Sequence, residues 1–192
     1  MNKLWGGGAY FNDLLPFGEN EIMVDCGAFN GDTAIMFAQK HPSYKKIYAY
    51  EPDPVIFNSL AKNTSDLRIA PFNKGVFSKT CTLSFDIQNN GCSSLNCKGQ
   101  TQIEVEAIDD LLSIETNPIT FIKMDIEGSE LEALKGSSAI IQKDKPKLAI
   151  CVYHKANDLF AIPEFIKSLR SDYKFYLRNH QMIPEDTVLY AY

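Results

Sequence analysis

The chain has 192 residues, of which 45% are hydrophobic and 22% charged, so it is long enough for one well-packed domain and too short for two substantial ones. A net charge of −5 without clustered lysines or arginines argues against nucleic acid as a partner. No apolar run approaches the roughly 20 residues of a membrane span, and the N-terminus has no signal-like apolar stretch, so we expect a cytoplasmic protein without a membrane partner.

The five cysteines are odd in number and contain no Cys-x-x-Cys pair. This pattern indicates neither a disulfide framework nor a zinc site, and we expect no metal. Cys26 and Cys151 lie in apolar runs, where a cysteine is typically a small core residue.

The chain divides into two parts by composition. Residues 1–20 are rich in glycine and aromatic side chains and are predicted to form a cap segment. Residues 21–192 alternate strand-like and helix-like runs, which predicts a single α/β domain. Within it, the short alternating runs at about 76–107 predict a β-rich insertion.

The first predicted strand leads into a glycine turn. An apolar run opened by Glu21 is followed by Gly27 and Gly31, and then by an amphipathic run over 33–39. This pattern is typical of a buried parallel strand that turns into a helix. The glycines permit close approach of a ligand, and the first N–H groups of the helix have no partner in the helix itself.

Two details of this turn argue against a dinucleotide site. The spacing is Gly-x-x-x-Gly, with Phe29 where a pyrophosphate-binding turn has its second glycine. Two carboxylates, Asp25 and Asp32, flank the turn and would repel phosphate. We therefore predict that the turn, including Ala28, receives a ligand with positive charge.

A second predicted strand, over 46–51, ends in Glu51. An acid at this position accepts hydrogen bonds from the hydroxyls of an adenosine ribose. A nucleoside joined to an amino acid with positive charge between them is S-adenosylmethionine, which we predict as the cofactor.

A third group of acids follows a strand predicted over 119–126. Asp125 and Glu127 lie at its carboxyl end, and should face the same crevice as Asp25 and Glu51 because ligands of open α/β sheets bind there. His154 follows the next predicted strand, over 147–153. Its position favours a general base for a hydroxyl group, although a histidine at a strand end is commonly structural.

Other polar residues have simpler interpretations. Glu130 and Glu132 open a helix, where carboxylates offset the helix dipole. Lys123 is predicted to pair with one of the nearby acids, and Asp109 to cap a short helix over 108–112.

These motifs together resemble the class I S-adenosylmethionine-dependent methyltransferases, and among them the FkbM-type family. The resemblance covers nearly the whole chain and depends most on the long Lys-x-Asp-x-Glu-Gly-x-Glu motif that begins at Lys123. It implies an α/β, three-layer, Rossmann-like fold whose mostly parallel seven-stranded sheet has a reversed final strand and helices on both faces. It also implies O-methylation of a sugar or another small-molecule hydroxyl.

The resemblance assigns roles to residues. Cofactor binding falls to Asp25, Gly27, Ala28, Phe29, Gly31, Asp32, Glu51, Asn73, Gly75, Asp125 and Glu127. His154 and Asp125 are the candidates for the catalytic positions. Asn73 and Gly75 are included among the cofactor-binding candidates because a loop after the third strand lies near the adenine in this family. The alternative is that they only form a turn, as an asparagine near a glycine commonly does.

Two other functions remain open from the sequence. A nucleotide-dependent oxidoreductase would bind NAD and not S-adenosylmethionine. A catalytically silent module would bind the cofactor, methylate no acceptor and tolerate the loss of His154.

Overall fold

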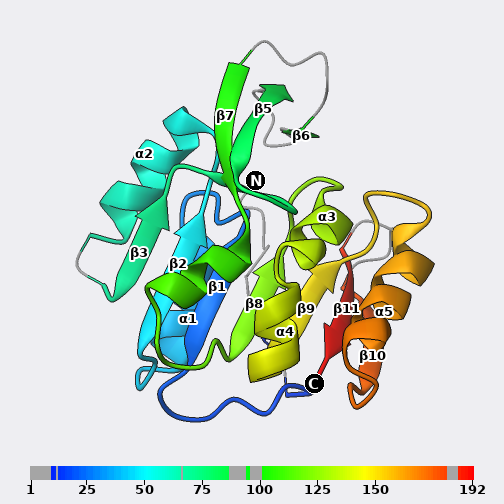
Figure 1. Ribbon diagram of the computed structural model, residues 1–192. Helices are drawn as coiled ribbons and strands as arrows, with labels where there is room; N and C mark the ends of the chain where they lie inside the picture. The colour runs from blue at the N-terminus through cyan, green and yellow to red at the C-terminus, as the bar shows by residue number, and fades with distance from the viewer. Residues whose placement is uncertain (1–9, 12, 66, 87–93, 96–100, 181–185) are drawn as a thin grey trace.

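The computed structural model describes residues 10–11, 13–65, 67–86, 94–95, 101–180 and 186–192 (Figure 1). The first nine residues of the predicted cap segment, and residues 87–93 and 96–100 of the predicted β-rich insertion, lie outside the described residues.

The main sheet has seven strands in the order β10-β11-β9-β8-β1-β2-β3 (Figure 1). Their bounds are β1 (Ile22–Cys26), β2 (Lys46–Tyr50), β3 (Ile69–Phe72), β8 (Phe121–Met124), β9 (Lys147–Cys151), β10 (Phe175–Asn179) and β11 (Thr187–Ala191). Strands β3, β2, β1, β8 and β9 pair in parallel, while β11 runs antiparallel between β9 and β10. The predicted fold class, including the reversed final strand, is confirmed.

Helices cover both faces of this sheet (Figure 1). Their bounds are α1 (Asp32–Lys40), α2 (Pro54–Asn63), α3 (Glu130–Lys135), α4 (Ser138–Asp144), α5 (Asp158–Leu169) and the 3-10 helix η2 (Ile108–Ser113). Side chains of β1 alternate between the two cores, with Val24 packed among residues of η2, α3, α4 and α5, and Met23 among residues of α1. Among the described helices, none is long and apolar enough to cross a membrane.

The N-terminal segment packs on the α1 face. Phe11 is 2% exposed, and its ring meets that of Phe37 edge-on at 5.5 Å between centroids. Phe17 contacts the rings of both Phe37 and Phe121. These contacts bring the segment to the sheet beside β8.

The parallel register aligns the carboxyl ends of three neighbouring strands. Cys26, the last residue of β1, pairs with Tyr50 of β2 and Met124 of β8. The residues that follow these three strands therefore leave the sheet at the same edge.

A second sheet, in the order β4-β7-β5-β6, stands at the top of Figure 1. It consists of β4 (Gly75–Val76), β5 (Cys81–Asp86), β6 (Ser94–Leu95) and β7 (Thr101–Glu106). The segment predicted as a β-rich insertion forms this small sheet.

The structure differs from expectation at Asp109. Its carboxylate does not cap the short helix η2, whose N-cap is Ala107. It instead accepts the N–H groups of Ala139 and Ile140, both at 2.9 Å, in the first turn of α4. Helix α4 begins two residues after Gly136, directly after α3, and is not among the elements predicted from the sequence.

We expect Asp109→Ala to lower the free energy of unfolding by about 1 kcal/mol, since two N–H groups of α4 lose their acceptor. Asp109→Asn should retain part of the stability, because its single amide oxygen can replace only one of the two carboxylate oxygens that accept these bonds. Urea unfolding of both variants would check this, and equal losses would show that the charge rather than the hydrogen bonds matters.

Candidate functional site

The glycine turn after β1 is tied to the end of β2. The N–H groups of Gly27 and Ala28 donate to the carbonyl oxygen of Tyr50 at 3.1 and 2.9 Å. Gly27 and Gly31 have φ values of 78° and 90°, and Phe29 between them has φ 49°. The left-handed conformations explain the two glycines of the motif.

Asp25 lies beneath this turn and is fully buried. Its Oδ1 is 3.1 Å from Nζ of Lys123, which also donates to the carbonyl oxygens of Gly27 and Cys26 at 2.8 and 3.3 Å. Burial favours the neutral amine, but the carboxylates of Asp25 and Asp125 outweigh it and raise the pKa of Lys123. Lys123 thus forms its ion pair with Asp25 and not, as predicted, with one of the acids that follow its own strand. Direct contact of Asp25 with a cofactor stays a prediction.

Glu51 follows β2 and faces the turn. Its Oε2 accepts the N–H of Phe29 at 3.0 Å, and its Oε1 accepts the N–H of Asp53 at 2.9 Å. The residue is only 7% exposed, and burial raises the pKa of its carboxyl group to about 7. Each carboxylate oxygen keeps acceptor capacity for a ligand hydroxyl.

Asn73 supports the Glu51 turn from the next strand. Its side-chain amide donates to the carbonyl oxygens of Glu51 and Pro52 at 3.0 and 3.1 Å. Gly75 begins β4, where an added Cβ would lie 3.8 Å from Cβ of Pro52. Both residues therefore lie beside Glu51, while Asp32 is exposed at the start of α1.

Asp125 follows β8 and is held by two tyrosines. Tyr10 donates to its Oδ2 at 2.7 Å and Tyr153 to its Oδ1 at 3.1 Å. Burial raises the pKa of Asp125, but Lys123 and the Tyr10 hydrogen bond outweigh this and lower it. Asp125 is therefore a carboxylate at neutral pH, and its side chain is 27% exposed.

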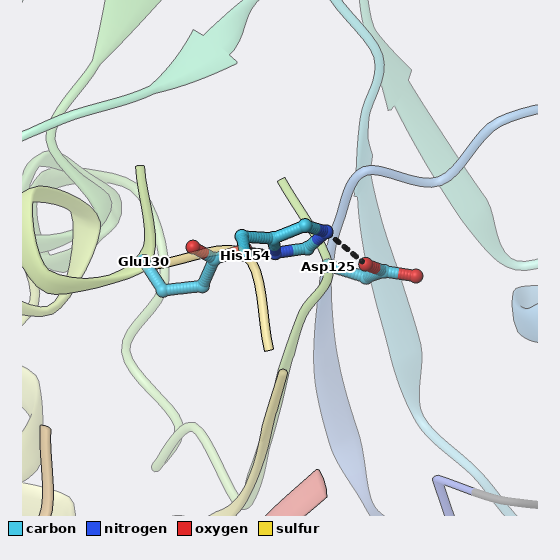
Figure 2. A group of neighbouring side chains, drawn as sticks. All are labelled: Asp125, Glu130 and His154. Carbon is cyan, nitrogen blue, oxygen red and sulfur yellow. Dashed lines mark ion pairs between the residues drawn. The ribbon is translucent and has the colours of Figure 1, made fainter. Parts of the chain in front are cut away.

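His154 lies between Asp125 and Glu130 (Figure 2). Its Nε2 is 3.5 Å from Asp125 Oδ1 and 3.5 Å from Glu127 Oε2, and its Nδ1 is 2.8 Å from Glu130 Oε1. Burial lowers the pKa of His154, but the contact with Glu130 and the charges of Asp125 and Glu127 outweigh it and raise this pKa.

The two groups of predicted site residues adjoin each other at the same edge of the sheet. An added Cβ on Gly27 would lie 2.0 Å from the carbonyl oxygen of Asp125, so the turn and the end of β8 touch. The sequence did not predict that Tyr10 and Tyr153 hold Asp125. Glu130 was assigned to the helix dipole alone, although it is fully buried against His154.

Comparison with known proteins settles the family. Residues 25–175 match the model of the Methyltransferase FkbM domain. The chain belongs to the FkbM methyltransferase family. This confirms the resemblance inferred from the Lys-x-Asp-x-Glu-Gly-x-Glu motif.

The chain is similar to members of this family in sequence, and it shares its fold with more distant proteins. The crystal structure of Methyltransferase FkbM from Methylobacillus flagellatus KT superposes with a TM-score of 0.80 at 35% identity, over 97% of this chain and 47% of that one. The hexuronic acid methyltransferase AglP of Haloferax volcanii is 29% identical over 130 residues, which are 65% of this chain and 53% of AglP. Fibrillarin of Aeropyrum pernix with natively bound S-adenosyl-L-methionine shares the fold, with a TM-score of 0.53 at 12% identity over 97% of this chain and 76% of fibrillarin. The chain thus spans about half the length of the two more similar relatives.

Proposed function

We propose that the protein is an S-adenosylmethionine-dependent methyltransferase that methylates a hydroxyl group of a sugar or of another small molecule. Family membership supports methyl transfer, and the name of the hexuronic acid methyltransferase AglP supports a saccharide acceptor. We propose no nucleic-acid partner, in keeping with the acidic composition.

The observation that carries this proposal is the position of Glu51. The carboxyl group of Glu51 is buried at the end of β2, is fixed by the N–H groups of Phe29 and Asp53, and in its ionised form keeps acceptor capacity on both oxygens. A ribose with two adjacent hydroxyls fits such a bidentate acceptor. The turn residues Gly27, Ala28 and Gly31 would lie along the amino-acid part of the cofactor.

The acidic character of the same edge suits a cationic ligand. Asp125 and Glu127 would attract the positively charged amino-acid part of S-adenosylmethionine or orient the acceptor. When bound, the cofactor supplies an electrophilic methyl group for an in-line displacement. The residues of the chain hold donor and acceptor in register and exclude water.

His154 is the candidate base for the acceptor hydroxyl. Its Nε2 faces Asp125 and Glu127, the two acids that are partly open to solvent, and Glu130 Oε1 lies 2.8 Å from the other ring nitrogen. In this role His154 takes the hydroxyl proton as the methyl group transfers.

The direct test is calorimetric titration with S-adenosylhomocysteine, with NAD as the competing ligand. Binding of S-adenosylhomocysteine, followed by transfer of labelled methyl groups to a panel of uronic acids and other saccharides, is the expected result. Binding of NAD alone would contradict the proposal, and cofactor binding without methylation of any acceptor would indicate a silent module.

Glu51→Ala should weaken the binding of S-adenosylhomocysteine by about 1 to 3 kcal/mol, because the ribose hydroxyls lose a buried acceptor. Glu164→Ala, the same substitution at an exposed position of α5, should leave the affinity unchanged. Calorimetry on both variants measures the difference. Unchanged affinity in a folded Glu51→Ala protein would refute the ribose assignment.

A further inference from the structure

Several carboxylates surround a single histidine at the end of β8. Asp125, Glu127 and Glu130 all lie within 3.5 Å of a ring nitrogen of His154. Asp158, at the start of α5, adds its negative charge to the same surroundings. Carboxylates held this closely repel one another unless cations compensate them, and a single imidazole carries at most one positive charge.

Two buried side chains in this group have polar atoms without hydrogen bonds. Glu130 is fully buried, and while its Oε1 accepts the N–H of Ile126 at 2.9 Å, its Oε2 makes no hydrogen bond. The His154 side chain is 8% exposed, and neither of its ring nitrogens has a hydrogen bond of proper geometry despite the short distance to Glu130. Buried polar atoms are nearly always bonded, so these orphaned atoms indicate a ligand that the protein itself does not supply.

We propose that Asp125, Glu130 and His154 bind a divalent metal cation. One ligand atom from each of these residues lies within 4.8 Å of the other two (Figure 2). Glu127 can add a fourth ligand atom, because its Oε2 is 3.5 Å from His154 Nε2. Ligand atoms around one ion at about 2.1 Å lie roughly 3 to 4.5 Å apart. Because Glu130 lies beside Nδ1 and Asp125 beside Nε2, binding requires the His154 ring to turn so that one nitrogen faces the ion together with both carboxylates.

The ligand set indicates the class of metal. Carboxylate oxygens suit Mg²⁺ and Mn²⁺, whereas imidazole nitrogen suits later transition metals, so a mixed set of this kind favours Mn²⁺ over Mg²⁺. Asp125 and Glu127 are 27% and 32% exposed in their side chains, which leaves one side of the site open. A cation with an open position can bind a further oxygen.

The role of this cation, unlike its binding, rests on the proposed methyltransferase function. An acceptor hydroxyl on the open side would be polarised by the cation and would release its proton to solvent water on that side as it takes up the methyl group. His154 would then be a metal ligand and not the base.

The test is titration of the EDTA-treated chain with Mn²⁺, in which electron paramagnetic resonance measures the concentration of the free ion. We expect saturable binding of one Mn²⁺ per chain. His154→Gln and Glu130→Gln should weaken it at least tenfold. Glu132→Gln is the matched control, because Glu132 lies on α3 like Glu130 but pairs with Lys135 at the surface.

Circular dichroism on the same samples shows whether each variant is folded. Titration with S-adenosylhomocysteine shows whether loss of Mn²⁺ binding and loss of cofactor binding occur separately. Absence of saturable Mn²⁺ binding at millimolar concentration, or equal Mn²⁺ affinity in all three variants, would overturn the metal site. S-adenosylhomocysteine binding without Mn²⁺ binding would leave the proposed function standing and remove the metal. Mn²⁺ binding without any binding of S-adenosylhomocysteine would support the metal site and contradict the proposed function.

Discussion

Replacing Lys123 with methionine should lower the free energy of unfolding by about 3 to 5 kcal/mol, because it leaves the carboxylate of Asp25 buried without its cation. The Lys123 and Asp25 side chains are 2% and 0% exposed, so water cannot take the place of the ammonium group. The variant also loses the bonds from Nζ to the carbonyl oxygens of Cys26 and Gly27. Lys135→Met removes an exposed ion pair on α3 and should cost less than about 1 kcal/mol.

The loss in Lys123→Met should depend on pH. Burial already raises the pKa of Asp25, with Asp32 and Asp125 adding to the rise, and Lys123 is the group that opposes them. Without Lys123, folded Asp25 holds its proton at pH values where the unfolded chain has lost it, above about pH 4. The folded state then binds more protons, so the free energy of unfolding falls as pH rises from this value toward neutrality.

Urea unfolding between acid and neutral pH measures this dependence. The double variant Asp25→Asn/Lys123→Met buries no charge and should be more stable than Lys123→Met at neutral pH. If the double variant and Lys123→Met had the same free energy of unfolding at every pH, the charge of Lys123 would not matter. Packing of the lysine side-chain carbons would then hold the turn.

The sequence was informative wherever an apolar run ended in a charged residue. Because parallel strands of similar length align their carboxyl ends, the acids after three such runs were predicted to meet, and the register of Cys26 with Tyr50 and Met124 aligns the ends of those strands. The sequence could not show how deep each acid lies. Asp25 is fully buried, while the Asp125 side chain is 27% exposed, and this difference depends on the packing of the N-terminal segment and the turn.

Partners far apart in the chain were the least predictable part of the site. Tyr10 and Asp125 are separated by 115 positions, and no local pattern marks a tyrosine in a glycine-rich segment as a hydrogen-bond donor to a strand end. The same holds for Asp109, whose acceptor role depends on how η2 packs against α4. Glu130 was more accessible to sequence reasoning, because it belongs to the same motif as Asp125 and Glu127.

Replacing Gly27 with alanine should destabilise the protein by about 3 kcal/mol or more. The left-handed conformation at φ 78° costs roughly 1 to 2 kcal/mol for a residue with a Cβ atom. The Cβ would also lie 2.0 Å from the carbonyl oxygen of Asp125, which is backbone and cannot rotate away. Relief of this clash requires the turn and the end of β8 to separate, which stretches the hydrogen bond from the Asp125 N–H to the Cys26 carbonyl oxygen, 3.1 Å long.

Gly18→Ala is the control for Gly27→Ala, because a Cβ at Gly18 meets only Glu21 Oε1 at 3.9 Å. It should change stability by less than about 1 kcal/mol. Thermal unfolding would separate the two, since about 3 kcal/mol corresponds to a fall of roughly 6 to 12 °C for a chain of this size. The same shift of the Asp125 backbone should weaken binding of S-adenosylhomocysteine in Gly27→Ala, because the glycine turn and the acidic cluster would no longer be in register. A stable Gly27→Ala protein with full affinity would show that the turn is not held against β8 in solution, and the proposed cofactor site would lose its geometric basis.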